Sequence, residues 1–502
     1  MGYILKNARF IFWSGLLILF TSPVYGQTDT LTGVALIDKY LLEKKLKQAD
    51  SILNEQLYYY TSQNLIDSLY AYPYYIGKIA QLKTNTNEGI QKATNFVNRI
   101  VASTTNKTTL YKSYKNVSDF YDALGLNSEA YNASKTALTY ALEVKNIKPE
   151  EIALMRSNIG YSAYSLNNFS ESKQLYLQAT KEYESSKTTK PEALADAYNT
   201  TATLMWHFNK LDSAQIYFEK AIKTIDKGAS DKYNKLYLIS VTKTNIALLE
   251  ESKGNVSTSI SIQKEIINTL NNVIKNTNDQ TTKERSKRIQ SIALSNLGAT
   301  YSDLGNLTKA YEIEKLAYKK KKEAYEPTDI RIANTLLNIA IAELNLKEYD
   351  KSINTCNEII EEIDKSPGDY LVLKANVLNV KAQNYLKKGN VNTARDTFLA
   401  CEKLFANEKP TEYTQEHLDF LITYSQFLAN QNSVEESILN AKKGYNYVHK
   451  YGGSANLSIL KQIINVGQVY YILGNYNEAE KWATDGISYI NNHITNFNTT
   501  LD

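Results

Sequence analysis

A small residue recurs along this chain at a nearly constant interval, and this repeat limits the possible folds more than any other feature. The steps between successive copies are 41, 42, 42, 45, 51, 42, 42, 43 and 42 residues. A second Ala or Ser follows most copies by 12 residues, and a Gly or Asn follows most by seven. We call the recurring position the small slot; it is occupied by Gly77, Ser118, Gly160, Ala202, Ala247, Gly298, Ala340, Ala382, Ser425 and Gly467.

The repeat predicts a pair of amphipathic helices in each unit. Gly or Asn suits the left-handed residue that ends a helix, and small residues on both helices let their backbones approach closely. Seven Pro and 20 Gly in 502 residues are too few for a chain of short strands and turns. Because one hairpin cannot bury its apolar face alone, neighbouring hairpins must stack, so we expect an all-α solenoid.

The motifs of these units resemble the tetratricopeptide repeat family. The best match comprises residues 296–298, Tyr301, residues 305–307, Ala310 and Ala317, and the unit at Gly467 is similar. The 42-residue period is longer than the usual 34 and resembles the variant in kinesin light chains and exported bacterial arrays. The resemblance implies a right-handed superhelix of about eleven helix-turn-helix hairpins.

The ends of the chain differ from the repeats. Lys6 and Arg9 precede an apolar stretch at 10–20, and Pro23 and small residues lead to Gly26, which predicts a signal peptide at 1–26. An uncleaved membrane anchor is the alternative. We expect repeats at 27–490 with a long polar loop at 276–287, and a polar tail at 491–502. The mature chain would be exported to the bacterial periplasm or to the extracellular space, without stable membrane insertion.

The sequence lacks the common catalytic and cofactor motifs. It has no phosphate-binding loop, no dinucleotide fingerprint and no nucleophile elbow. Its four histidines, His207, His417, His449 and His493, stand apart from other ligand residues. The near balance of 57 basic and 53 acidic residues argues against nucleic acid as a partner. We therefore expect no enzymatic activity, metal or cofactor.

Two further features have competing interpretations. Cys356 and Cys401 are expected to be small buried residues, and a disulfide between them is the alternative in an exported protein. The lysines at 319–322 close a predicted second helix. They would interact favourably with the helix dipole, or else form a binding patch.

The strongest functional signal is an asparagine two residues before the small slot. Asparagine is a poor helix former, but its amide can both donate to and accept from a peptide backbone. In tetratricopeptide proteins the first helices line the concave groove, and the resemblance implies that asparagines at this position hold peptide ligands. Bonds to neighbouring helices or water are the alternative. This asparagine ladder consists of Asn116, Asn158, Asn245, Asn296, Asn338 and Asn465.

Two functions follow from this pattern. In the first, the chain is a scaffold that holds a protein or an extended peptide in its groove, with Tyr161, Tyr164 and Gln468 as further contacts unless the tyrosines only pack internally. In the second, it is the sensory half of a signalling or peptidase system, resembling arrays joined to a CHAT-type peptidase or a histidine kinase, whose effector domain is absent from this chain. The sequence leaves the partner and the oligomeric state open.

Overall fold

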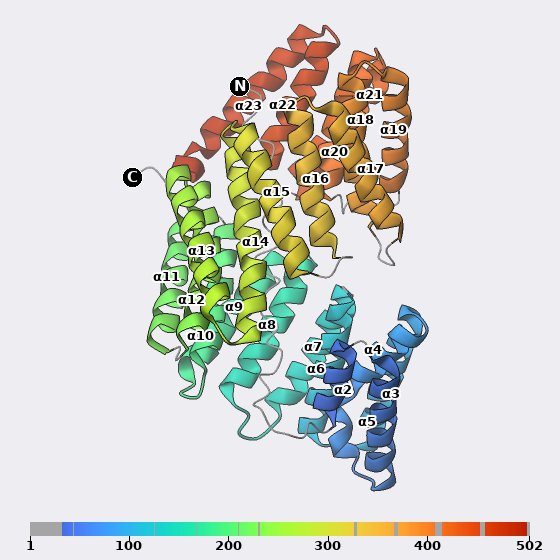
Figure 1. The fold of residues 1–502 in the computed structure, drawn as a ribbon, viewed down its shortest axis with the longest axis vertical. Helices are drawn as coiled ribbons and strands as arrows, with labels where there is room; N and C mark the ends of the chain where they lie inside the picture. Colours follow the sequence, from blue (N-terminus) through green and yellow to red (C-terminus); the bar gives the residue numbers. More distant parts are fainter. Residues whose placement is uncertain are drawn as a thin grey trace. The chain divides into compact units, whose positions relative to one another are not determined.

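The computed structural model describes residues 33–498, apart from short gaps at 44, 125, 167, 209, 229–230, 326–328, 366–369, 407–413 and 452–456. The predicted signal peptide lies outside the described residues. Within them the chain is helical and contains no strand, as the repeat predicts (Figure 1). The helices belong to two compact units that divide at Asp231, which we call the N-unit and the C-unit.

The N-unit consists of five helical hairpins. In each, a first helix packs along the second helix that follows it, and a short 3-10 helix, η1 (Ile66–Ala71), precedes the second hairpin. The hairpins are α2 (Val34–Leu42) with α3 (Leu46–Ser62), α4 (Pro73–Lys83) with α5 (Thr86–Ser103), α6 (Lys107–Ala123) with α7 (Asn127–Leu142), α8 (Pro149–Ser165) with α9 (Phe169–Ser185), and α10 (Pro191–His207) with α11 (Leu211–Gly228).

The C-unit adds six hairpins of the same kind, so the described residues form eleven, as predicted. Figure 1 shows these helices as successive antiparallel pairs. They are α12 (Lys232–Ser252) with α13 (Val256–Asn276), α14 (Gln280–Asp303) with α15 (Leu307–Ala324), α16 (Ile330–Asn345) with α17 (Tyr349–Lys365), α18 (Leu371–Lys387) with α19 (Val391–Phe405), α20 (Gln415–Asn430) with α21 (Val434–Tyr451), and α22 (Leu457–Ile472) with α23 (Tyr476–Asn498).

The small slot is where the two helices of a hairpin come closest. The Ser172 hydroxyl donates to the carbonyl oxygen of Gly160 at 2.7 Å, and the Ser352 hydroxyl donates to that of Ala340 at the same distance. In a third hairpin the direction is reversed, since the Ser118 hydroxyl donates to the carbonyl oxygen of Ala130 at 2.9 Å. These bonds join the slot to the small residue twelve positions later, which confirms the predicted close approach.

The turns that join the helices also follow the prediction. Gly254, Gly305, Gly389 and Gly474 have φ values of +85°, +77°, +82° and +76°. Residues with a side chain rarely adopt this left-handed backbone conformation, whereas glycine adopts it without steric cost. Where the repeat lacks its turn glycine, Lys347 itself takes the conformation, with φ of +65°.

Successive hairpins pack through large residues of one second helix and the next first helix. The ring of Phe405 on α19 stacks on His417 of α20, with centroids 4.4 Å apart. Phe398 of α19 meets Phe427 of α20 at 5.0 Å. Phe398 and Phe405 are both buried, so the apolar side chains of α19 depend on the following hairpin to cover them.

Two predicted boundaries differ from the structure. The predicted loop at 276–287 is wrong: α13 continues to Asn276 and α14 begins at Gln280, so the extra residues lengthen two helices. Asp279 makes this possible because its carboxylate accepts from the backbone N–H groups of Thr281 and Thr282, at 3.3 and 2.8 Å. At the C-terminal end, α23 continues to Asn498, so most of the predicted tail is helical.

No described helix combines the length and apolar character that a membrane span requires.

A methyl group at a tight slot should destabilise its hairpin. A Cβ atom on Gly160 would lie 2.9 Å from the buried ring of Tyr176, whereas the nearest atom to a Cβ on Gly467 is Trp482 Cβ at 3.3 Å. Overpacking costs ~1–3 kcal/mol and alanine gains about 1 kcal/mol over glycine in a helix. We therefore expect Gly160→Ala to lower the free energy of unfolding by about 1 kcal/mol in urea titrations followed by circular dichroism. Gly467→Ala is the control, and equal stability of the two variants would contradict the tight contact.

Candidate functional site

In the C-unit, the ladder asparagine Asn465 is used to hold hairpins together. Its side chain is 1% exposed. Its Oδ1 accepts from Gln426 Nε2 at 3.0 Å, and its Nδ2 donates to Ser425 Oγ at 3.1 Å. Since Gln426 also donates to Gln468 Oε1 at 2.8 Å, these amides link α20 to α22. A ligand would have to displace these bonds to reach Asn465.

The other ladder residues of the C-unit are also largely enclosed. Asn245 and Asn296 are 5% and 3% exposed. The Nδ2 of Asn296 has no hydrogen-bond partner in the described structure. Asn338 is half-buried, and its Nδ2 lies 3.5 Å from Glu314 Oε1 on α15, at the limit of a hydrogen bond. The C-unit therefore offers little exposed amide surface at this position.

The two ladder residues of the N-unit differ from each other. Asn116 is half-buried, and its Oδ1 accepts from the backbone N–H of Tyr74 at 2.7 Å. Tyr74 is in the first turn of α4, where N–H groups have no partner within the helix, so Asn116 satisfies one of them. Asn158 on α8 is also half-buried, but the described structure gives its amide no hydrogen-bond partner. Asn158 thus keeps its amide available to a ligand.

Two half-buried carboxyl groups lie on the first helices of the hairpins before and after α8. Burial raises the pKa of Asp122 on α6 to about 6, with a smaller contribution from the negative charge of Asp119. Burial alone raises the pKa of Asp196 on α10 to about 7. Among the described residues, neither carboxylate has a hydrogen-bond or ion-pair partner. Carboxylates removed from water without compensation are uncommon in folded proteins and gather at functional sites.

Tyrosines connect these carboxyl groups to α8. Tyr161 and Tyr164 are half-buried on α8, and Tyr176 of α9 is buried. Burial raises the pKa of Tyr176 well above its usual value, and the charges of Asp196 and Asp122 raise it further. The pKa of Tyr161 is also raised, mainly by burial and to a smaller extent by the negative charge of Asp122. Asp122, Asp196, Tyr161 and Tyr164 are thus all within electrostatic range of Tyr176, and Asn158 lies one turn before Tyr161 on α8. We call Asp122, Asn158, Tyr161, Tyr164 and Asp196 the α8 site.

Sequence reasoning finds Asn158, Tyr161 and Tyr164 but misses both carboxylates. Asp122 lies four residues after its slot, where the next two units have Tyr164 and Trp206. Asp196 lies six residues before its slot, where the preceding unit has Leu154. Other units carry polar or charged residues at the same two positions, such as Glu251 and Lys112, so the repeat pattern holds no signal that could have found the two carboxylates.

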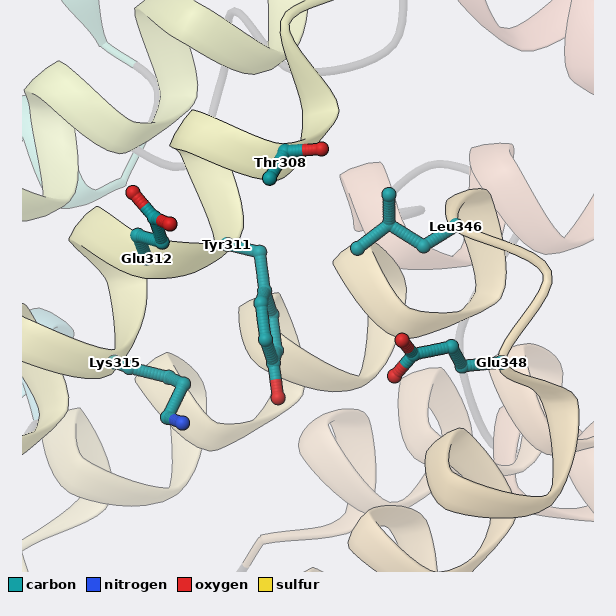
Figure 2. Close-up of a pocket in the computed structure, with 6 residues that line it drawn as sticks. All are labelled: Thr308, Tyr311, Glu312, Lys315, Leu346 and Glu348. Atoms are coloured by element: carbon teal, nitrogen blue, oxygen red, sulfur yellow. The ribbon is translucent and has the colours of Figure 1, made fainter.

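A separate pocket of about 500 Å³ lies in the C-unit, between α15 and the turn from α16 to α17 (Figure 2). Figure 2 shows the ring of Tyr311 lying between Lys315 and Glu348. The Tyr311 hydroxyl donates to Glu343 Oε1 at 3.3 Å, and the Lys351 ammonium lies 4.5 Å from the ring centroid. The tyrosine is therefore satisfied by its own neighbours. The pocket-lining residues are Thr308, Tyr311, Glu312, Lys315, Leu346 and Glu348.

The remaining candidate residues have structural surroundings. Cys356 and Cys401 are fully buried free thiols, so the disulfide alternative is wrong. In the lysine run, Lys321 is 9% exposed and donates to Thr335 Oγ1 at 2.5 Å, so it joins α15 to α16. The described residues contain no cluster of three or more His, Cys, Asp or Glu side chains placed to hold a metal ion.

Both thiols should resist modification in the folded protein. Burial raises the pKa of Cys356 to about 12 and that of Cys401 still higher, and the reactive form of cysteine is the thiolate. We expect Ellman's reagent to detect no thiol in native protein and both of the chain's two cysteines in guanidinium chloride. Rapid reaction of a native thiol would contradict the burial.

Stability should depend on pH through Asp196. Its pKa is about 7 in the folded state and near the ordinary aspartate value of 3.8 when the chain is unfolded. Between these values the folded state holds the extra proton, so the free energy of unfolding falls as pH rises from 4 to 7. We expect Asp196→Asn to reduce this fall in urea titrations from pH 5 to pH 8. Parallel pH profiles for the two proteins would show that Asp196 is not desolvated.

No protein-family model and no curated protein matches the chain. Solved structures do share its helical-repeat organisation. The apo form of RapI is 10% identical, with a TM-score of 0.46 over 84% of this chain and 99% of that chain. A tetratricopeptide repeat protein from Parabacteroides merdae is 16% identical, with a TM-score of 0.39 over 66% and 99%. A kinesin light chain-type repeat protein from Podospora anserina is 14% identical, with a TM-score of 0.32 over 41% and 95%. The structural neighbours of the chain thus include tetratricopeptide repeat proteins.

Proposed function

We propose that this protein is an exported, non-enzymatic scaffold that binds a protein or an extended peptide through the α8 site. One observation carries the proposal: α8 bears an amide without a partner, Asn158, and the flanking first helices bear two carboxyl groups without partners, Asp122 and Asp196, whose pKa values burial raises. These half-buried groups have hydrogen-bonding capacity that no described residue uses, and a ligand on this surface could complete it.

The chemistry of the α8 site favours a basic ligand. Lysine or arginine would supply the charge and the hydrogen-bond donors that Asp122 and Asp196 lack. The Asn158 amide can pair with a peptide backbone without regard to sequence, and the ring of Tyr161 can pack beside it. A ligand that contacted Asn116 or Asn465 would have to displace hydrogen bonds that these side chains already make. We therefore place the peptide contact at Asn158 and the specificity at the two carboxylates.

Export is the second part of the proposal and rests on the basic and apolar pattern of residues 1–26. Mass spectrometry of protein produced in a bacterial host with its own leader tests it. A mature chain that begins at Gln27 supports export, and an intact N-terminus in the cytoplasmic fraction contradicts it.

Peptide selection tests the binding site. A displayed library of random peptides selected on the full chain should yield sequences enriched in Lys and Arg. Asn158→Ala should weaken a selected peptide about five-fold, since one hydrogen bond is worth ~1 kcal/mol, while Asn338→Ala at the same ladder position serves as the matched control. The double variant Asp122→Asn, Asp196→Asn should abolish the preference for basic peptides.

Binding of a selected basic peptide should also tighten as pH rises from 6 to 8, because ionised carboxylates at Asp122 and Asp196 attract the ligand's charge. Isothermal titration calorimetry measures this change in affinity. Peptides without basic residues, or equal affinities for wild type and Asn158→Ala, would place binding on another surface.

A further inference from the structure

The last described hairpin exposes a surface that is covered in the nine hairpins before it. The residue 23 positions after the small slot is at most 9% exposed in nine hairpins, whereas Ile490 in the last is 38% exposed. The nine covered residues are Ile100, Ala141, Tyr183, Ile225, Leu270, Lys321, Ile363, Phe405 and Val448, with exposures of 1, 0, 8, 3, 0, 9, 8, 3 and 2%.

Two other positions of this hairpin are also more exposed than the equivalent residue of an earlier hairpin. Sixteen residues after the slot, Phe398 is fully buried against the next hairpin, whereas Ala483 is exposed. Four residues after the slot, Ala429 is 4% exposed, whereas Tyr471 is 66% exposed. The exposed surface therefore corresponds to the interface that joins successive hairpins elsewhere in the described residues.

The exposed apolar residues of α23 form one stripe. Tyr476, Ile487 and Ile490 are 64%, 60% and 38% exposed. Tyr476, Ala483 and Ile490 are spaced by seven residues and Ile487 follows Ala483 by four, so all four share a helix face. Half-buried Ala479 adjoins them. We call these five residues of α23 the terminal face.

The terminal face is complementary to itself. Tyr476 and Ile490 lie seven residues before and after Ala483, and Ala479 and Ile487 lie four before and after it. Two antiparallel copies of α23 with a two-fold axis at Ala483 would place Tyr476 against Ile490 of the second copy. They would also place Ala479 against Ile487 of the second copy, with the two Ala483 side chains at the axis. Large residues would meet smaller ones throughout, and the central alanines would allow close approach of the helices.

We propose that the protein forms a symmetric homodimer in which α23 packs antiparallel to α23 of a second copy through the terminal face. Closed two-fold dimers are the commonest assemblies of soluble proteins, and such an interface must be self-complementary. A head-to-tail contact would instead propagate into a filament, because each added copy would expose the same face again. The dimer covers the apolar stripe without extending further.

Analytical ultracentrifugation of the full chain is the first test. Wild-type protein should sediment with twice the mass of one chain. Ala483→Arg and Ile487→Asp should each raise the dimer dissociation constant roughly 30-fold or more, as loss of an interface hot spot does. Ile216→Asp, at an apolar residue of α11 that is 54% exposed, is the matched control and should remain dimeric. Circular dichroism shows that each variant is folded.

Cross-linking tests the position of the two-fold axis. Because both native cysteines are buried, a cysteine introduced on the surface is the reactive thiol. Ala483→Cys should form a disulfide-linked dimer under mild oxidation, whereas Ser488→Cys, exposed away from the terminal face, should not. A monomeric wild type, a filament, or a dimer that Ala483→Arg leaves intact would overturn the proposal and assign the face to another partner.

Discussion

The close approach of two helices at the small slot is the contact on which the rest of the structure depends. A backbone carbonyl at the slot can accept a hydrogen bond from the facing helix only because both positions carry small side chains, as Gly160 and Ser172 do at 2.7 Å. The ring of Tyr176 then covers Gly160 where a methyl group would not fit. Each hairpin thereby becomes a thin layer with apolar residues left over on one side, and those residues require another layer.

The same stacking explains where functional groups and interfaces can occur. Within a stack, a polar side chain on a first helix is desolvated by the next hairpin whether or not it finds a partner. Asn465 finds Ser425 and Gln426, and Asn116 finds the start of α4, so these amides stabilise the stack. Asp122 and Asp196 find none, and their raised pKa values record the unfavourable burial of the charge. At the last described hairpin an apolar residue is left exposed, as Ile490 shows.

Much of the fold can be predicted from the sequence because the repeat is a local pattern. The slot residues, the second small residues and the turn glycines recur at fixed spacings within each hairpin. Predictions are weaker where capping chemistry competes with polarity. The polar stretch at 276–287 indicates a loop, but Asp279 starts a helix there, and its polar residues Thr282 and Ser286 are buried. The ladder pattern cannot separate Asn158 from Asn465, since a partner such as Ser425 lies 40 residues away in the sequence.

By itself, the sequence determined the fold class, the eleven hairpins and the positions where helices touch, because the spacing of small and large residues encodes these directly. Only the tertiary structure decided which polar residues are satisfied and which are not. Two aspartates at unrelated repeat positions, on α6 and α10, come within electrostatic range of the tyrosines on α8 and α9 through stacking. Desolvation depends on every neighbour around a group, and those neighbours are brought together only when the hairpins pack.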